Sequence, residues 1–155
     1  MKYFVLLALL AIIALGVSLS PKVFAAVEAG AELQIGETDF SVDVAASSVA
    51  QVRGLSWRET MAADSGMVFV YTQPRHQSFW MYGMQFPLDF VWIRDFTVIG
   101  IHENVGHPEA NNGEIIRVSS PEPADMVLEI NAGEIAKNGI KVGDPVTFYR
   151  FAASR

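Results

Sequence analysis

Residues 77–93, QSFWMYGMQFPLDFVWI, form a strongly apolar stretch that contains a single charged residue, Asp89. If residues 88–93 form a strand, Asp89 shares one face with Val91 and Ile93, and the other three side chains share the opposite face. Both faces are largely apolar, which predicts a strand covered on both sides. An ionised carboxylate in such a place needs partners. Asp89 is therefore either a buried structural anchor or the mark of a site.

The rest of the chain after residue 25 reads as short strands separated by turns. Alternating or continuous apolar patterns predict further strands at 40–44, 67–71, 97–102, 114–118, 126–130 and 146–151. Two short helices are expected, one over 56–63 behind a Ser-x-x-Glu capping box and one over 131–138 with Gly139 at its end. Many strands with two short helices predict a mainly β fold, a compact β-barrel or sandwich of about eight to ten short strands. No βαβ alternation is visible, so a parallel α/β sheet is not expected.

The first 25 residues have the features of a secretory signal. A short positive start precedes an apolar run over 3–19, and the small residues Val23 and Ala25 predict cleavage after Ala25. The alternative is an uncleaved anchor, since 17 apolar residues lie near the lower limit for crossing a bilayer. Residues 26–38 are expected to be a linker or lead-in, and 39–155 a single domain. The protein is thus expected in the periplasm or outside the cell, or held in the membrane by residues 3–19.

Composition narrows the range of partners. The chain has a net charge of −6, and −8 without residues 1–25, because two lysines and no acidic residue lie there. Such a surface argues against nucleic acid and against anionic lipid. A membrane contact is expected only through the N-terminal segment, if that segment stays uncleaved. The chain has no cysteine, so an exported domain would have no disulfide and would rest on its apolar core.

An ordered set of short motifs resembles the domain-of-unknown-function 192 (DUF192) family over about residues 49–149. The motifs are Arg53-Gly54-Leu55, Arg58, Gly66-Met67-Val68-Phe69, Phe79-Trp80-Met81, Pro87-Leu88-Asp89, Leu128-Glu129 and Gly133. The resemblance implies a small, mainly β domain, often exported, with no established biochemical activity. Ser56 stands where the family usually has Met, and Tyr82-Gly83 where it commonly has Lys-Asn. An anion-holding role of that family pair is therefore not carried over to this chain.

The candidate site is built around Asp89. Pro87 fixes the entry to the strand, and Arg53 or Arg58 is the expected partner because a guanidinium can take both carboxylate oxygens. This cluster is either a structural clamp or one side of a ligand pocket with Trp80 and Met81 as its apolar wall. Gly54, Gly66, Pro87, Glu129 and Gly133 are assigned structural roles.

Three functions remain open on the sequence. The first is a non-catalytic ligand-binding or accessory module of the cell envelope, which binds an unknown small molecule or envelope component without a cofactor. The second is a hydrolase of an envelope polymer that uses Asp89 with a nearby carboxylate such as Glu129. The third is a metal-binding domain that uses the loop with His102 and His107, although its spacing fits no compact metal motif, and no metal ligand is assigned.

Overall fold

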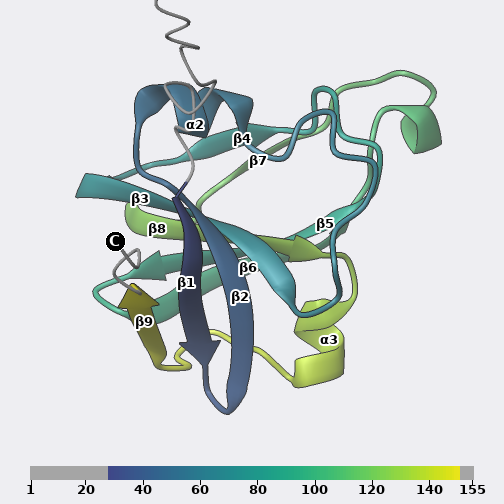
Figure 1. Cartoon of the computed structure of the whole chain (residues 1–155). Helices are drawn as coiled ribbons and strands as arrows, with labels where there is room; N and C mark the ends of the chain where they lie inside the picture. The colour runs from purple at the N-terminus through teal and green to yellow at the C-terminus, as the bar shows by residue number, and fades with distance from the viewer. Residues whose placement is uncertain (1–27, 151–155) are drawn as a thin grey trace, which may run out of the picture.

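The structure, a computed structural model, describes residues 28–150 (Figure 1). Within that range it has nine strands, two short α-helices and one 3-10 turn. The strands are β1 (Glu28–Ile35), β2 (Thr38–Ala45), β3 (Ser65–Arg75), β4 (Ser78–Trp80), β5 (Leu88–Arg94), β6 (Thr97–Val105), β7 (Arg117–Ser119), β8 (Ala124–Asn131) and β9 (Val146–Arg150). The helices are α2 (Ser48–Arg53) and α3 (Glu134–Asn138), and the 3-10 turn η2 is Glu109–Asn111. None of these helices has the length and apolarity needed to span a bilayer.

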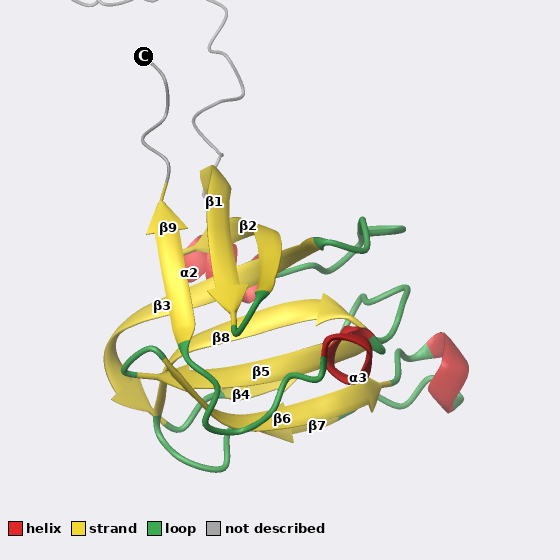
Figure 2. Ribbon diagram, turned by 90° about the horizontal axis from the view of Figure 1, so that it is seen from below, coloured by secondary structure: helices red, strands yellow, loops and turns green. Residues whose placement is uncertain are grey.

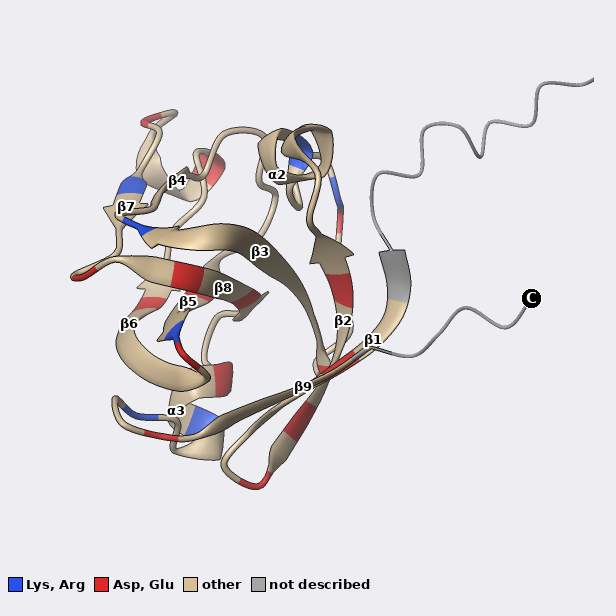
Figure 3. Cartoon of the chain, turned by 90° about the vertical axis from the view of Figure 1, so that its left-hand side faces the viewer, with Lys and Arg blue, Asp and Glu red and all other residues tan. Residues whose placement is uncertain are grey.

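Seven strands form one sheet in the order β6-β5-β8-β3-β2-β1-β9, and β4 pairs with β7 in a separate small sheet. The large sheet curls strongly, as Figures 2 and 3 show. Its two edge strands approach each other through the segment before β9, where Val98 N–H donates to the Asp144 carbonyl at 3.0 Å and Val146 N–H donates to the Phe96 carbonyl at 2.9 Å. The predicted mainly β class is confirmed, in the form of a curled half-barrel. Among the strands of residues 28–150, only β2 and β3 pair in parallel, and α2 lies in the crossover between them.

Two apolar clusters lie on the two faces of the sheet. One cluster draws side chains from all strands of the large sheet and from α3, such as Leu33, Phe40 and Leu128. The other cluster lies on the opposite face of β3, β5 and β8, beneath α2 and the small sheet. Its members include Phe69, Phe90 and Trp92. Strand β5, which lies between β6 and β8, is buried on both faces from Leu88 to Ile93. The predicted strand over residues 88–93, covered on both sides, is therefore confirmed.

The expected first helix over 56–63 is wrong, and the helix lies at Ser48–Arg53 instead. Ser47 is its N-cap and accepts a hydrogen bond from the Ala50 amide at 3.2 Å, and Gly54 ends it with a positive φ of 50°. Ser56 does not cap a helix, because its hydroxyl donates to the Tyr82 carbonyl at 2.9 Å. A long-range contact thus replaced the local capping box.

The second helix is confirmed but is shorter than expected. It begins at Glu134 with Gly133 as N-cap, at a φ of 90°, rather than at residue 131. Asn131 instead ends β8, and its side-chain amide donates to the carbonyls of Met61 and Ala62, both at 3.0 Å.

Residues 26–38, expected as a lead-in, contain the whole of strand β1, which pairs with β2 and β9. The folded unit therefore begins before residue 39. The other predicted strands are present, with β7 displaced toward Ser119, while β1 and β4 were missed. The signal or anchor predicted for residues 1–25 lies outside the described residues.

Candidate functional site

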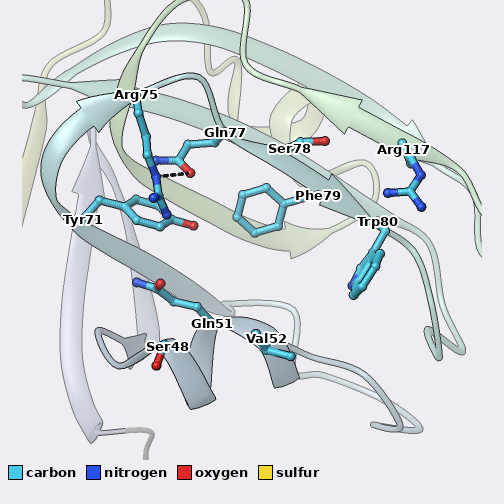
Figure 4. Close-up of a pocket in the computed structure, with 10 residues that line it drawn as sticks. All are labelled: Ser48, Gln51, Val52, Tyr71, Arg75, Gln77, Ser78, Phe79, Trp80 and Arg117. Atoms are coloured by element: carbon cyan, nitrogen blue, oxygen red, sulfur yellow. Dashed lines mark hydrogen bonds between the residues drawn. The ribbon is translucent and has the colours of Figure 1, made fainter.

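A cleft of about 440 Å³ lies between α2 and the small sheet. We call it the α2–β4 cleft, and Figure 4 shows its lining. Helix α2 and strand β3 supply one side, and β4, β7 and the residues before β4 supply the other. Its lining residues are Ser48, Gln51, Val52, Tyr71, Arg75, Gln77, Ser78, Phe79, Trp80 and Arg117.

Helix α2 is fastened to the sheet by Gln51. The Gln51 side-chain amide donates to the Val70 carbonyl at 2.9 Å and to the Ala45 carbonyl at 3.3 Å. Ala50 is buried beneath the helix, whereas Val49 and Val52 are exposed. The residues of this six-residue helix that border the cleft are Ser48, Gln51 and Val52, so Gln51 both fastens the helix and lines the cleft.

Strand β4 forms the facing wall by ordinary strand alternation. Phe79 points to the core and meets the Phe69 ring edge-on, with ring centroids 4.8 Å apart. Trp80 points the other way and is exposed. Gln77 is buried directly before the strand. Its side-chain amide donates to the Ala124 carbonyl at 3.2 Å, and its backbone N–H donates to the Ser120 hydroxyl at 2.9 Å. The wall is thus rigid at one end and presents an indole at the other.

Two guanidinium groups stand at opposite ends of the cleft, with Phe79 between them (Figure 4). Arg75 lies over the Tyr71 ring at 4.9 Å and its Nε donates to Gln77 Oε1 at 3.4 Å. Arg117 lies over the Trp80 ring at 5.5 Å. Figure 3 shows the end of β3 and the start of β7, where these arginines lie, as basic segments on the same side of the molecule.

Neither arginine is neutralised by an acid within residues 28–150. The ion pairs described there are Arg58–Asp43, Arg94–Glu122, Lys137–Glu134 and Lys141–Asp144. The cleft lining contains no Asp or Glu. In a chain with 17 acidic residues, this makes the cleft a local positive field suited to an anion.

Two titratable groups near the cleft are held neutral. Burial raises the pKa of the Tyr71 hydroxyl to about 12, against an opposing effect of Arg75, so Tyr71 stays a hydrogen-bond donor. Burial raises the pKa of Glu129 to about 8, against an opposing effect of Arg58. Glu129 lines a small cavity of about 30 Å³ that shares four lining residues with the cleft, Gln51, Val52, Phe79 and Trp80. That volume suits about one water molecule. The carboxyl group of Glu129 therefore lies behind the residues that the small cavity and the cleft share.

The five residues expected to form a ligand site do not come together. Trp80 lines the cleft, and Arg53 lines the small cavity beside it. Arg58 lies in a different hollow and pairs with Asp43, whose carboxylate is 2.6 Å from its guanidinium. Met81 and Asp89 are buried. The sequence reading missed Arg75, Arg117 and Tyr71, and no local motif marks them, because the cleft is assembled from separate strands.

Asp89 is a buried anchor for backbone amides, and its expected pairing with Arg53 or Arg58 is wrong. It is 0% exposed. Its Oδ1 accepts a hydrogen bond from the Asn104 amide at 2.7 Å, and its Oδ2 accepts one from the Ile135 amide at 2.9 Å. The first bond holds β6 at a residue with a φ of 53°, and the second holds the first turn of α3. The face that Asp89 shares with Val91 points away from α2, so Arg53 at the end of that helix cannot reach it, and Arg58 pairs with Asp43 instead.

The geometry also bears on the hydrolase and the metal-binding domain that the sequence left open. Phe90 pairs with Glu129 and Asp89 pairs with Ile130 in the β5–β8 ladder, so the two carboxyl groups lie on opposite faces of the sheet and cannot act on one bond. His102 Nδ1 accepts a hydrogen bond from the Trp92 indole at 2.8 Å. Within residues 28–150 no group of three or more His, Asp or Glu side chains is placed to hold a metal ion.

The structure shows the local contacts or backbone conformation of four residues that were assigned structural roles. Gly54 ends α2 and Gly133 begins α3, both with positive φ. A Cβ on Gly66 would lie 2.7 Å from the Glu129 carbonyl oxygen. The carbonyl of Pro87 accepts a hydrogen bond from the Ala132 amide at 3.2 Å.

The DUF192 family model, described as "Uncharacterized ACR", matches residues 31–148. A mainly β half-barrel with this match defines the class, and the chain belongs to the DUF192 family. It is similar to a crystal structure from Sinorhizobium meliloti 1021, described as a candidate transcription regulator, with a TM-score of 0.70 and 30% identity over 78% of this chain and 95% of that one.

It is also similar to the crystal structure of a protein of unknown function from Novosphingobium aromaticivorans DSM 12444. That match has a TM-score of 0.69 and 29% identity, over 75% of this chain and 83% of the other. A search of the curated proteins finds no match to this chain.

Proposed function

We propose that this protein is a non-catalytic ligand-binding module of the cell envelope, exported by residues 1–25, and that the α2–β4 cleft binds a small anionic ligand. The observation that carries the proposal is the pair Arg75 and Arg117, which face one cleft without an acidic partner within the described residues.

The lining supports binding rather than catalysis. Two guanidiniums can each give paired hydrogen bonds to a carboxylate, and the rings of Tyr71, Phe79 and Trp80 supply flat apolar surface. The cleft has no carboxylate, cysteine or histidine among its lining residues, so its two serines, Ser48 and Ser78, have no histidine or carboxylate of the lining to activate them. The net charge of −6 also weighs against DNA as the ligand, whatever the role of the Sinorhizobium neighbour.

Ligand screening by thermal shift tests the cleft. The purified protein is heated with small carboxylates, among them glucuronate and benzoate, and with glucose as a neutral control. A ligand that binds the folded state raises the melting temperature by mass action. We expect carboxylates to do so and glucose not to.

Arginine variants locate the binding. Arg75→Gln and Arg117→Gln should each weaken anion binding about tenfold or more, as loss of a charge-assisted hydrogen bond predicts. Arg94→Gln is the matched control, since Arg94 pairs with Glu122 at 3.0 Å and does not line the cleft. If no carboxylate binds, or if Arg75→Gln and Arg117→Gln both bind the carboxylate as tightly as Arg94→Gln does, the proposal is wrong.

Export is tested separately. The N-terminal sequence of the protein recovered from the cell envelope should begin at Ala26. Recovery of a chain that begins at Met1 in the membrane would favour the anchor instead.

A further inference from the structure

Three exposed aromatic side chains continue the wall of the α2–β4 cleft. Trp80 is 49% exposed, Tyr82 is 50% exposed and Trp57 is 66% exposed. The Trp80 and Tyr82 ring centroids are 6.3 Å apart, and the Tyr82 and Trp57 centroids are 5.8 Å apart. We call this row the aromatic ridge. Since Trp80 also lines the cleft, ridge and cleft form one continuous surface.

The ridge is held in place by a strained backbone. Trp57 has a φ of 68°, a left-handed conformation that bulky residues rarely adopt. The backbone N–H of Trp57 donates to the Gly83 carbonyl at 2.8 Å, and the Ser56 hydroxyl donates to the Tyr82 carbonyl at 2.9 Å. A Cβ on Gly83 would lie 2.9 Å from the Trp57 ring, so only glycine lets the indole lie against that turn. Strain that presents an indole to solvent, rather than burying it, points to an interaction surface.

The chemistry of the surface changes along its length. Arg75 and Arg117 mark the cleft as the place for negative charge, whereas the outer ridge of Tyr82 and Trp57 has flat rings with polar tips. Such rings stack on other flat surfaces while their O–H and N–H groups stay hydrogen-bonded. A matching ligand therefore has an acidic unit next to a neutral, ring-shaped unit.

We infer that the cleft and the aromatic ridge together bind a glycan in which acidic and neutral sugars alternate. The inference rests on the proposed function of the cleft and names its ligand class. The acidic sugar lies between Arg75 and Arg117, and the neutral sugar next to it contacts the rings of Tyr82 and Trp57, whose centroids are 5.8 Å apart. A densely charged chain fits less well, because the whole protein has a net charge of −6.

Calorimetric titration of the full purified protein tests this with three probes. These are hyaluronate oligosaccharides, which alternate glucuronate and N-acetylglucosamine, glucuronate itself, and neutral chito-oligosaccharides. Hyaluronate oligosaccharides should bind about tenfold or more tighter than glucuronate, because the neutral sugar adds apolar surface buried against aromatic rings. Chito-oligosaccharides, which lack the carboxylate, should bind more weakly than hyaluronate.

Variants separate ridge from cleft. Trp57→Ala and Tyr82→Ala should each lower hyaluronate affinity about tenfold, as truncation of an aromatic side chain in a binding surface commonly does, and leave glucuronate affinity unchanged, whereas Arg75→Gln should lower both. Phe96→Ala is the matched control, because Phe96 is also an exposed aromatic with positive φ but lies outside the ridge. Trp57→Gly, which suits the left-handed conformation, repeats the test without backbone strain.

The outcomes distinguish the two proposals. If glucuronate binds in an Arg75-dependent manner but hyaluronate binds no tighter, the cleft proposal stands and the glycan inference is overturned. The inference is also overturned if no hyaluronate binds, or if the ridge variants behave like Phe96→Ala. Trp57-dependent binding of single-stranded DNA or lipid vesicles in preference to hyaluronate, or Trp57-dependent self-association, would overturn it in favour of that partner.

Discussion

Replacement of Asp89 by asparagine removes one of two buried backbone anchors without changing the size of the side chain. The carboxylate accepts amides from Asn104 and Ile135 with separate oxygens. Asparagine has one acceptor oxygen, so its NH₂ group must face the second amide donor. The variant therefore loses one charge-assisted hydrogen bond and leaves a buried N–H without an acceptor.

The two effects set the expected magnitude. A hydrogen bond to a charged group contributes ~1.5–3 kcal/mol, and a stranded buried donor costs ~1–3 kcal/mol. The neutral side chain offsets part of this because it is easier to bury than a charge. We expect a net destabilisation of ~2–4 kcal/mol, which for a domain of this size corresponds to a drop in melting temperature of roughly 8–16 °C.

Thermal unfolding followed by circular dichroism measures the drop, and hydrogen exchange at the Asn104 and Ile135 amides shows where it arises. Both amides should exchange faster in the variant. Asp39→Asn is the matched control, since Asp39 is exposed on β2 and should change stability by less than ~0.5 kcal/mol. If Asp89→Asn melts within ~2 °C of Asp39→Asn, Asp89 is not an anchor and the reasoning from residues 77–93 is refuted.

Three further predictions concern the two faces of the sheet. Burial raises the pKa of Glu129 to about 8 from about 4.5, so between these pH values the folded state holds a proton that the unfolded chain releases. The free energy of unfolding should therefore be highest below pH ~4.5 and should fall toward pH ~8, by up to ~1.4 kcal/mol per pH unit. Urea unfolding should show this decline in the wild type and not in Glu129→Gln, and equal slopes would contradict it. Gly66→Ala should cost ~1–3 kcal/mol because its Cβ would press on the β8 backbone, whereas Gly106→Ala, whose nearest contact is at 3.4 Å, should be nearly neutral in the same assay. Arg58→Gln breaks a half-exposed ion pair with Asp43 and should cost less than ~1 kcal/mol, and a loss above ~3 kcal/mol would show that the pair is part of the core.

Some features of this fold are written locally in the chain. Alternation with a period of two placed Asp89 with Val91 and Ile93 on one face of a buried strand, and the structure has that strand at Leu88–Arg94. The second helix was recognised because Gly139 ends it in a left-handed conformation, which is a property of that residue and its neighbours.

Other features depended on contacts between distant residues. The partners of Asp89 are amides 15 and 46 positions away, and the Ser56 hydroxyl binds a carbonyl 26 positions away instead of capping a helix. Arg75 and Arg117 lie on strands of two different sheets and meet one cleft only because the small sheet packs across the large one. Side-chain alternation and capping act over a few residues, so the sequence by itself determined strands and their faces. Register, curl and sheet packing act over the whole chain, so only the tertiary structure decided which charges meet a partner and which face an open cleft.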